Sequence, residues 1–317
     1  TIMWVGGATA FLSACLALVE YDLKRILAYS TLSQLGYMVM ALGLGGPVAG
    51  MYHLTTHAFF KALLFLAAGS VIHGTHEQDI RKLGGLLRSM PWTSATFLIG
   101  SLALCGVPGL AGFFSKDEIL VLAQAHAPAL YWLGTLTAGL TALYIARAWF
   151  VAFTGAPASG DHHGASSAHP HVHESPPVML IPLCLLAILS VVGGYVGIPG
   201  FLGKSHGTFH WSVAITSTLV VAAGLTIAWL IYKRKAVASH HVVQALALPR
   251  SLLERRYYID ELYTWYVTRI QQRILAGSCA AIERYVIIGF AVNGVARLTQ
   301  GAGWLLRFCQ TGQVQTY

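Results

Sequence analysis

Long stretches of this 317-residue chain contain no aspartate, glutamate, lysine or arginine: 1–19, 26–60, 62–76, 89–115, 119–146, 175–203 and 205–232. A helix needs about 20 apolar residues to cross a bilayer, so several of these stretches are long enough to span one. Charged residues form only 10% of the chain, against about 25% in an average soluble domain. The sequence therefore predicts an all-α polytopic membrane protein. An ordinary globular enzyme, a disordered chain and a nucleic-acid-binding protein are all disfavoured, despite the net charge of +8.

Seven membrane spans are predicted, at 1–19, 27–45, 51–73, 92–124, 129–153, 178–198 and 212–232. The fourth is too long for one straight crossing, and Pro108 lies inside it between glycine residues. Proline removes a backbone donor and glycine loosens a helix, so a broken helix is expected there. Such a break persists in a membrane only where protein or a polar cavity satisfies the freed backbone groups.

The charges between the spans predict the orientation of the chain. Loops after odd-numbered spans carry eight basic residues: Lys24, Arg25, Arg81, Lys82, Arg88, Lys233, Arg234 and Lys235. The loops on the other side carry only Lys204. The excess of basic residues places the first face in the cytoplasm.

No cofactor site is predicted in this chain. Its five cysteines are scattered without a CxxC pair, and no dinucleotide-binding or P-loop motif is present. The polar loop at 154–177 contains five histidines, at positions 162, 163, 169, 171 and 173. A metal-binding tract is one interpretation of this loop, but a solvated low-complexity segment is favoured because no ordered ligand spacing supports a site.

The third predicted span contains His53, His57 and Lys61, which share one helix face at i, i+4 and i+8. Lys61 lies near the middle of that span, where a lysine costs about 2.5–3.5 kcal/mol to insert. One interpretation is a structural lysine satisfied by carbonyls or a carboxylate. The favoured interpretation is a relay that gains and loses a proton, since desolvation disfavours the charged ammonium and histidine titrates near neutral pH.

Other polar residues inside the spans are more ambiguous. Ser30, Ser33, Gln34 and Tyr37 form a stripe typical of hydrogen bonding between helices. Lys116 and Asp117 follow the predicted break, and they are either part of an interfacial loop or part of an ion site at exposed half-helix ends. Arg147 could be structural or line a pathway, and Lys24 has the position of a charge at the cytoplasmic edge.

The last segment, 250–317, is different in character. Charges return, and apolar residues recur at helical spacing, as at Ile259, Tyr263, Tyr266, Ile270 and Ile274. We expect an amphipathic helix without a spanning run. It would either lie on the membrane surface or act as a strut along neighbouring subunits.

Several motifs resemble the antiporter-like subunits of respiratory complex I, and among them the subunit L family. These are DLKRILAYSTLSQLGYM (22–38), HLTTHAFFKALLFLAAGSVIH (53–73), GFFSKDEIL (112–120), YYIDELY (257–263) and TGQVQTY (311–317). The last two resemble the long lateral helix of that family. The resemblance implies four segments: a five-helix inverted-repeat unit with a broken helix (1–153), a polar loop (154–177), two further spans (178–235) and the lateral helix (250–317).

The resemblance also implies residue roles in proton translocation. Lys61 matches the mid-membrane channel lysine, and Lys116 matches the terminal lysine on the exit side. His53 and His57 match histidines that link a hydrated axis. Lys24 belongs to a DxKR motif, and Asp117 follows Lys116 in the SKDE motif.

The implied complex oxidises NADH and reduces quinone in other subunits, which hold FMN and iron–sulfur clusters. Partners would be neighbouring antiporter-like subunits of the membrane arm, within the lipid bilayer and without nucleic acid. The alanine- and glycine-rich composition favours a bacterial inner membrane. Members of the family are roughly twice this length, and a first repeat with its Glu–Lys pair and a final anchor are not found here. The chain is therefore expected to be a C-terminal fragment.

Three alternatives remain. A subunit of an Mrp-type cation/proton antiporter shares the lysines, although it does not need a strut along a row of neighbours. A scaffold of the membrane arm without a transport role is another. A substrate-binding transporter is the least favoured, because the sequence shows a polar axis rather than a specific pocket.

Overall fold

The computed structural model describes residues 1–155, 172–203, 210–234, 247–310 and 312. Most of the histidine-rich loop, Lys204, Lys235 and nearly all of the TGQVQTY motif lie outside the described residues. The chain divides into two compact units, residues 1–254 and 255–317. Each unit is described by itself.

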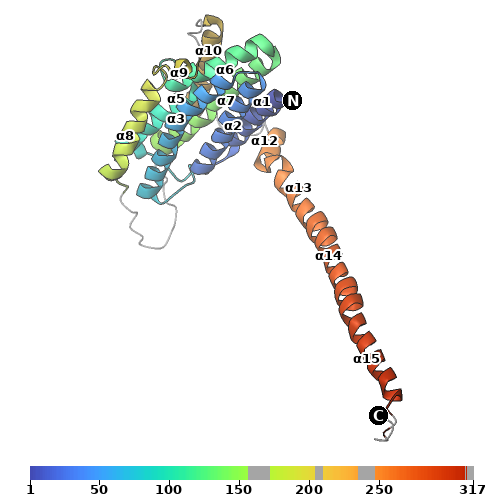
Figure 1. Cartoon of the computed structure of the whole chain (residues 1–317). Coiled ribbons are helices and arrows are strands. Elements are labelled where there is room, and N and C mark those ends of the chain that lie inside the picture. Colours follow the sequence, from blue (N-terminus) through green and yellow to red (C-terminus); the bar gives the residue numbers. More distant parts are fainter. Residues whose placement is uncertain (156–171, 204–209, 235–246, 311, 313–317) are drawn as a thin grey trace, which may run out of the picture. The chain divides into compact units, whose positions relative to one another are not determined.

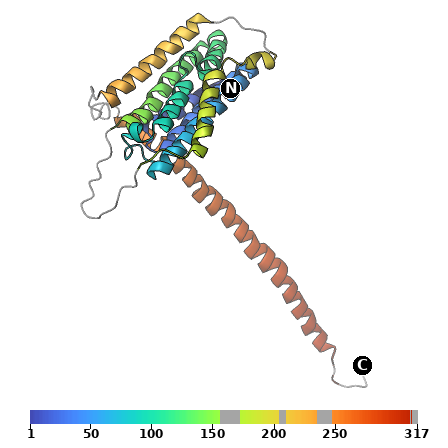
Figure 2. The ribbon, with the colours of Figure 1, turned by 90° about the vertical axis from the view of Figure 1, so that its left-hand side faces the viewer.

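The first unit is a bundle of helices that pack side by side (Figures 1 and 2). Its helices are α1 (Ile2–Val19), α2 (Leu23–Gly43), α3 (Pro47–Thr75), α4 (Leu86–Ser89), α5 (Pro91–Cys105), α6 (Ala111–His126), α7 (Pro128–Trp149), α8 (Pro177–Val192), α9 (Ile198–Phe201), α10 (Trp211–Ala228) and α12 (Ala247–Glu254). Short π-helical segments, Phe150–Thr154 and Trp229–Lys233, extend α7 and α10. The described residues form no strand, so the predicted all-α class is confirmed.

The predicted spans correspond closely to these helices. Among the described residues, six helices are long and apolar enough to cross a membrane, and five of them match predicted spans one, two, three, five and seven. The fourth is broken between Cys105 and Ala111, as expected, and the sixth forms the shorter α8. The second helix begins at Leu23, four residues before the predicted start, because the Asp22 side chain caps it by accepting the Arg25 N–H at 3.0 Å.

Helix α3 packs against α2, α5, α6 and α8. Helices α1 and α2 approach closely through glycines. A Cβ atom on Gly36 would lie 2.5 Å from the backbone nitrogen of Ala10, and one on Gly6 would lie 2.3 Å from that of Met40. Small residues at such crossings let membrane helices pack backbone to backbone.

The second unit is helical over Arg256–Phe308 and buries none of its described residues. It comprises α13 (Ile259–Trp265), α14 (Gly277–Ala281) and α15 (Asn293–Phe308), joined by π-helical segments. The expectation that this stretch contains no run apolar enough to span a membrane was wrong. Between Arg273 and Arg297 the only charges are Glu283 and Arg284, which leaves a sufficiently apolar window around them.

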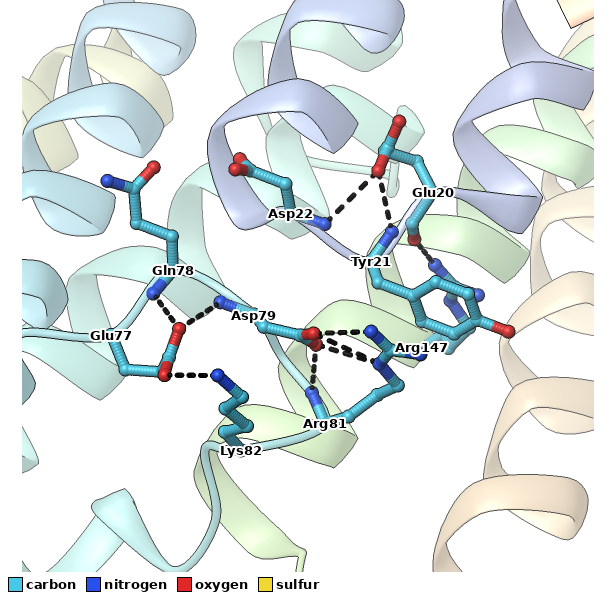
Figure 3. Close-up of polar contacts among 9 residues, drawn as sticks. All are labelled: Glu20, Tyr21, Asp22, Glu77, Gln78, Asp79, Arg81, Lys82 and Arg147. Carbon is cyan, nitrogen blue, oxygen red and sulfur yellow. Dashed lines mark hydrogen bonds and ion pairs between the residues drawn. The ribbon is translucent and has the colours of Figure 1, made fainter. Parts of the chain in front are cut away.

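A polar cluster joins the turn between α1 and α2 to the loop after α3 (Figure 3). The backbone N–H of Leu23 donates to the carbonyl of Gln78, and that of Ile80 donates to the carbonyl of Tyr21, both at 2.9 Å. Arg81 lies over the Tyr21 ring, 4.1 Å from its centroid. This loop pairing holds the two helix ends together on one face of the bundle.

Arg147 reaches the same turn from the end of α7. Its side chain is buried and donates a hydrogen bond to the carbonyl of Glu20, and its guanidinium lies 5.5 Å from the centre of the Tyr21 ring. A carbonyl and an aromatic face are both favourable neighbours for a guanidinium. Through these contacts Arg147 connects the end of α7 to the turn between α1 and α2.

Two carboxylates in the loop are stabilised in their ionised form. The backbone N–H groups of Asp79 and Gln78 donate to Glu77 and lower the pKa of its carboxyl. The Arg81 guanidinium binds Asp79 through both Nε and Nη2 and lowers the pKa of that carboxyl. A carboxyl whose pKa is lowered on folding stabilises the fold above its unfolded pKa, and this contribution is lost as the pH falls through the folded value.

We therefore expect the Asp79→Asn variant to show a weaker loss of stability on acidification than the wild type. Thermal unfolding in detergent micelles between about pH 3 and 7 would measure this, and the wild type should take up a fraction of a proton more on unfolding. Arg81→Gln removes the other half of the ion pair and should weaken the pH dependence in the same direction. The double variant should add nothing further. An unchanged pH dependence in both single variants would contradict the assignment.

Candidate functional site: a buried axis of two lysines and two histidines

Helix α3 carries three polar side chains along one buried face. His53 is fully buried, and His57 and Lys61 are each 5% exposed. The rings of His53 and His57 lie 6.0 Å apart, centre to centre, and Phe60 packs edge-on against His57 at 5.4 Å. The i, i+4, i+8 spacing has therefore placed all three inside the bundle rather than toward its outer surface.

Lys61 reaches helix α2. Its ammonium donates to the Ser30 hydroxyl and, at 3.1 Å, to the carbonyl of Leu27. Ser30 itself donates to the same carbonyl at 2.9 Å. Within the described part of the chain, no carboxylate lies within ion-pair distance of Lys61. Its charge is therefore solvated by neutral oxygen atoms and is not neutralised by a partner.

His53 bridges two helices through both ring nitrogens. Nδ1 lies 2.9 Å from the Ser115 hydroxyl on α6, and Nε2 lies 3.0 Å from the Gln34 side-chain oxygen on α2. A neutral ring satisfies both bonds when Nε2 donates to Gln34 and Nδ1 accepts from Ser115. Thr56 also donates to Ser115, at 2.7 Å. The hydroxyl of Ser115 thus joins the α3 face to the half-helix that carries Lys116.

Lys116 depends on the broken helix. Helix α5 ends at Cys105, where Gly106 adopts a left-handed conformation with φ of 85°, and the last carbonyls of a helix have no partner within it. The Lys116 ammonium, on α6, takes two of them: Leu104 at 2.9 Å and Cys105 at 3.4 Å. The negative end of the α5 dipole also favours a cation there. The break therefore supplies the site that holds a second buried lysine, which is only 2% exposed.

Two polar atoms near these side chains have no hydrogen-bond partner in the described part of the chain. Nε2 of His57 and Nε2 of Gln34 are buried without a hydrogen-bond partner among the described residues. Buried polar groups in native proteins are nearly always hydrogen-bonded, to protein or to ordered water. These two nitrogen atoms are therefore the positions at which ordered water would complete the missing hydrogen bonds.

Comparison with known proteins places this arrangement in a family. Residues 1–141 match the family described as NADH:quinone oxidoreductase/Mrp antiporter, transmembrane. The NAD(P)H-quinone oxidoreductase chain 5 of Picosynechococcus is 40% identical over all of this chain and 53% of its own length. The NADH-quinone oxidoreductase subunit L of Rickettsia bellii is 38% identical over 99% of this chain and 51% of its own length. The chain belongs to the subunit L/chain 5 family of antiporter-like membrane subunits.

Two solved structures contain chains that are similar to this one. The Mrp complex from Dietzia contains a chain that is 25% identical, with a TM-score of 0.60, over 93% of this chain and 34% of that one. A chain of the archaeal membrane-bound sulfane sulfur reductase is 29% identical, with a TM-score of 0.59, over 73% of this chain and 40% of that one. The chain spans about half the length of the family members that it matches.

The structure brings together four of the six residues that the sequence singled out. Lys61, His57, His53 and Lys116 lie along one buried run, with Ser30 at one end and the α5 carbonyls at the other. Asp117 is half-buried and faces Ser217 of α10, so it lies beside the run. Lys24 is exposed at the start of α2 and makes no contact with the run.

Within the described residues, no group of three or more histidine, cysteine, aspartate or glutamate side chains could hold a metal ion. His73 and His173 come near each other, with ring centres 6.2 Å apart, but they are only two. The rest of the histidine-rich loop lies outside the described residues.

Two further residues contact the axis in ways that the sequence did not predict. Ser115 links His53 to α6, and its position directly before Lys116 was the available signal. Tyr37 was assigned to a stripe between helices, yet its ring also lies 5.5 Å from the Lys116 ammonium. That contact depends on how α2 and α6 pack against each other. The spacing of residues along one helix does not predict such packing.

We predict that Gly112→Ala destabilises the site. A Cβ atom there would lie 1.8 Å from the carbonyl oxygen of Ala103, so the two half-helices would have to separate and the Lys116 carbonyls would move. The expected loss is about 1–3 kcal/mol, seen as earlier thermal unfolding in micelles. Gly69→Ala in α3 is the matched control, since nothing lies within 4 Å of its Cβ position. Equal unfolding temperatures for the two variants would refute the close contact.

Proposed function

We propose that this chain is the proton-conducting part of a membrane subunit of an NADH:quinone oxidoreductase. The observation that carries the proposal is the pair of buried lysines, each held by neutral oxygen atoms, with His57, His53 and Ser115 buried in the same part of the bundle. A lysine that is not neutralised by a carboxylate can lose its proton without leaving an unpaired anion behind. Family membership supports the same function, because relatives bear the names of quinone oxidoreductase subunits.

The geometry suggests how a proton would move. Lys61 passes its proton to a water molecule or hydroxyl beside Ser30 and His57. His53 can take up a proton at Nδ1, the ring nitrogen that carries no hydrogen in this tautomer, and release it through the Ser115 hydroxyl, while Nε2 keeps its hydrogen bond to Gln34. The proton then reaches Lys116 at the broken helix. Because two ammonium groups in one low-dielectric interior repel each other, protonation of one lysine disfavours protonation of the other.

The remaining parts of the assembly follow from this proposal. NADH oxidation, FMN, the iron–sulfur clusters and quinone would belong to partner subunits, and this subunit would sit in a bacterial cell membrane. The second unit fits contact with lipid or with neighbouring membrane-arm subunits, because its large apolar side chains are exposed along its whole length. Asp117 and Lys24 would act at the edges of the pathway.

The second candidate is a subunit of an Mrp-type cation/proton antiporter. The family description covers both kinds of protein, and the Dietzia Mrp complex aligns over 93% of this chain. Copurification separates the two. The proposal expects association with a peripheral arm that contains flavin and iron–sulfur clusters, whereas sodium-dependent antiport without NADH oxidation would establish the alternative.

The Lys61→Met variant tests the function directly. Methionine keeps the length and apolar stem of the side chain but removes the proton-carrying group. In membrane vesicles that contain the full-length subunit in its assembled complex, we expect NADH-driven proton pumping to fall at least about tenfold, while assembly is kept.

Lys82→Met is the matched control, because Lys82 is exposed and pairs with Glu77 in the loop after α3. It should pump at the wild-type rate. Unchanged pumping in Lys61→Met would rule out the relay, and failed assembly with normal pumping in the residual complex would favour the scaffold interpretation.

A further inference from the structure

The turn that follows α8, residues 193–195, is hydrogen-bonded to the broken helix. The turn is closed by the N–H of Tyr195, which donates to the Val192 carbonyl at 2.9 Å. The Tyr195 hydroxyl donates to the carbonyl of Gly109 at 3.1 Å. Gly109 belongs to the loop of residues 106–110 that separates α5 from α6. The pathway proposed above gives this turn no part.

Close packing against α6 accompanies this hydrogen bond. The ring of Tyr195 meets that of Phe114 edge to face, with the ring centres 4.9 Å apart. A Cβ atom on Gly194 would lie 3.0 Å from Cα of Ala111 and 2.5 Å from the Phe114 ring. The absence of a side chain at Gly194 therefore lets the turn approach the first residues of α6 this closely.

The same turn is bound to helix α3. The Tyr52 hydroxyl donates to the Gly194 carbonyl at 2.9 Å. Tyr52 directly precedes His53, which lies in the buried axis. The turn thus joins the helix that carries the histidines to the loop of the broken helix.

The loop between α5 and α6 determines which carbonyls are left for Lys116. The N–H groups of Gly106 and Val107 donate at 3.1 Å to two carbonyls in the last turn of α5. The next two carbonyls, those of Leu104 and Cys105, accept from the Lys116 ammonium instead. A different path of the loop would redirect these carbonyls, so the loop conformation sets how Lys116 is held.

We propose that the turn at residues 193–195 is a clamp that positions the two carbonyls at Lys116, with Tyr195 as a positioning residue. The inference rests on the proposed proton-conducting function. Gly106 and Gly109 have φ of 85° and 89°, and glycine by itself leaves a loop many alternative paths. The clamp restricts these paths, because it binds the loop at Gly109 and packs on the start of α6, the helix that carries Lys116.

Loss of the clamp would change how tightly Lys116 holds its proton. Carbonyl oxygen atoms stabilise an ammonium group more than they stabilise a neutral amine. A lysine whose carbonyls are displaced therefore gives up its proton more readily. Pumping through Lys116 would then need a higher proton concentration, and the alkaline limb of its pH profile would move to lower pH.

Other titratable groups surround Lys116, and the clamp variants leave them unchanged. They include Tyr37 of α2, His53 of α3, Cys105 of α5 and Asp117 of its own helix. Helix α7 contributes two buried tyrosines, at positions 131 and 144, and helices α8 and α10 contain no charged residue. A shift of the profile in a clamp variant would therefore report on the carbonyls.

The experiment uses Tyr195→Phe in the full-length subunit of the assembled complex in vesicles. Phenylalanine keeps the ring against Phe114 and removes the hydroxyl that binds Gly109. We expect normal assembly, because Tyr195 is 62% exposed. NADH-driven pumping per assembled complex should fall about 2- to 5-fold near neutral pH, with the alkaline limb about 0.3–0.7 of a pH unit lower. An unchanged profile would overturn the proposal, whether or not the rate falls.

Thr154→Val is the matched control. Its hydroxyl also donates to a backbone carbonyl, that of Phe150 at 3.0 Å, in the π-helical segment after α7. It should keep the wild-type rate and profile, and the same shift in Thr154→Val and Tyr195→Phe would overturn the clamp.

Gly194→Ala tests the clamp through its packing. The added methyl group would push the turn away from α6, so we expect a shift in the same direction as in Tyr195→Phe and at least as large. Gly200→Ala in α9 is its control, since nothing lies within 4 Å of that Cβ position. A wild-type profile in Gly194→Ala would also contradict the proposal.

Lys61→Met in the same vesicles separates the two levels of the argument. If Lys61→Met pumps normally, the proton-conducting function itself fails. If Lys61→Met loses pumping and Tyr195→Phe behaves as wild type, only the clamp is wrong.

Discussion

The arrangement of this bundle depends on how an ammonium group is kept inside apolar surroundings. Moving a charge out of water is costly, and proteins usually offset the cost with an opposite charge. Here Lys61 and Lys116 are instead held by a hydroxyl and by backbone carbonyls. Such partners stabilise the cation only partly, and they do not fix it, because a neutral amine can occupy the same position. A lysine held in this way is suited to binding a proton transiently.

The broken helix follows from the same requirement. A continuous helix keeps its carbonyls in internal hydrogen bonds, so it has none to offer a cation in mid-membrane. Ending α5 at Cys105 frees Leu104 and Cys105, and restarting the chain at Ala111 brings Lys116 back to them. Gly106 makes the turn possible and Gly112 allows the close approach of the two halves. Backbone geometry thus does the work that a carboxylate does in other proteins.

Much of this could be predicted from the sequence because its signals are local. Charge-free runs identified the spans, Pro108 between glycines identified the break, and the spacing of His53, His57 and Lys61 identified one helix face. The partners of those residues could not be predicted, since Ser30, Gln34 and Ser115 come from other helices and their pairing depends on packing. The spanning potential of the second unit was also missed, because the isolated pair Glu283 and Arg284 made an otherwise apolar stretch seem charged.

The central claim is that a chain of ordered water molecules connects Lys61 to Lys116. A cryo-EM map of the full-length subunit in its complex, at a resolution that shows ordered water, would test it most directly. We predict water molecules hydrogen-bonded in sequence from Lys61 past His57 to Lys116, close enough together to exchange protons. A gap between the two lysines that is closed by apolar side chains, without water in any state of the complex, would contradict the account.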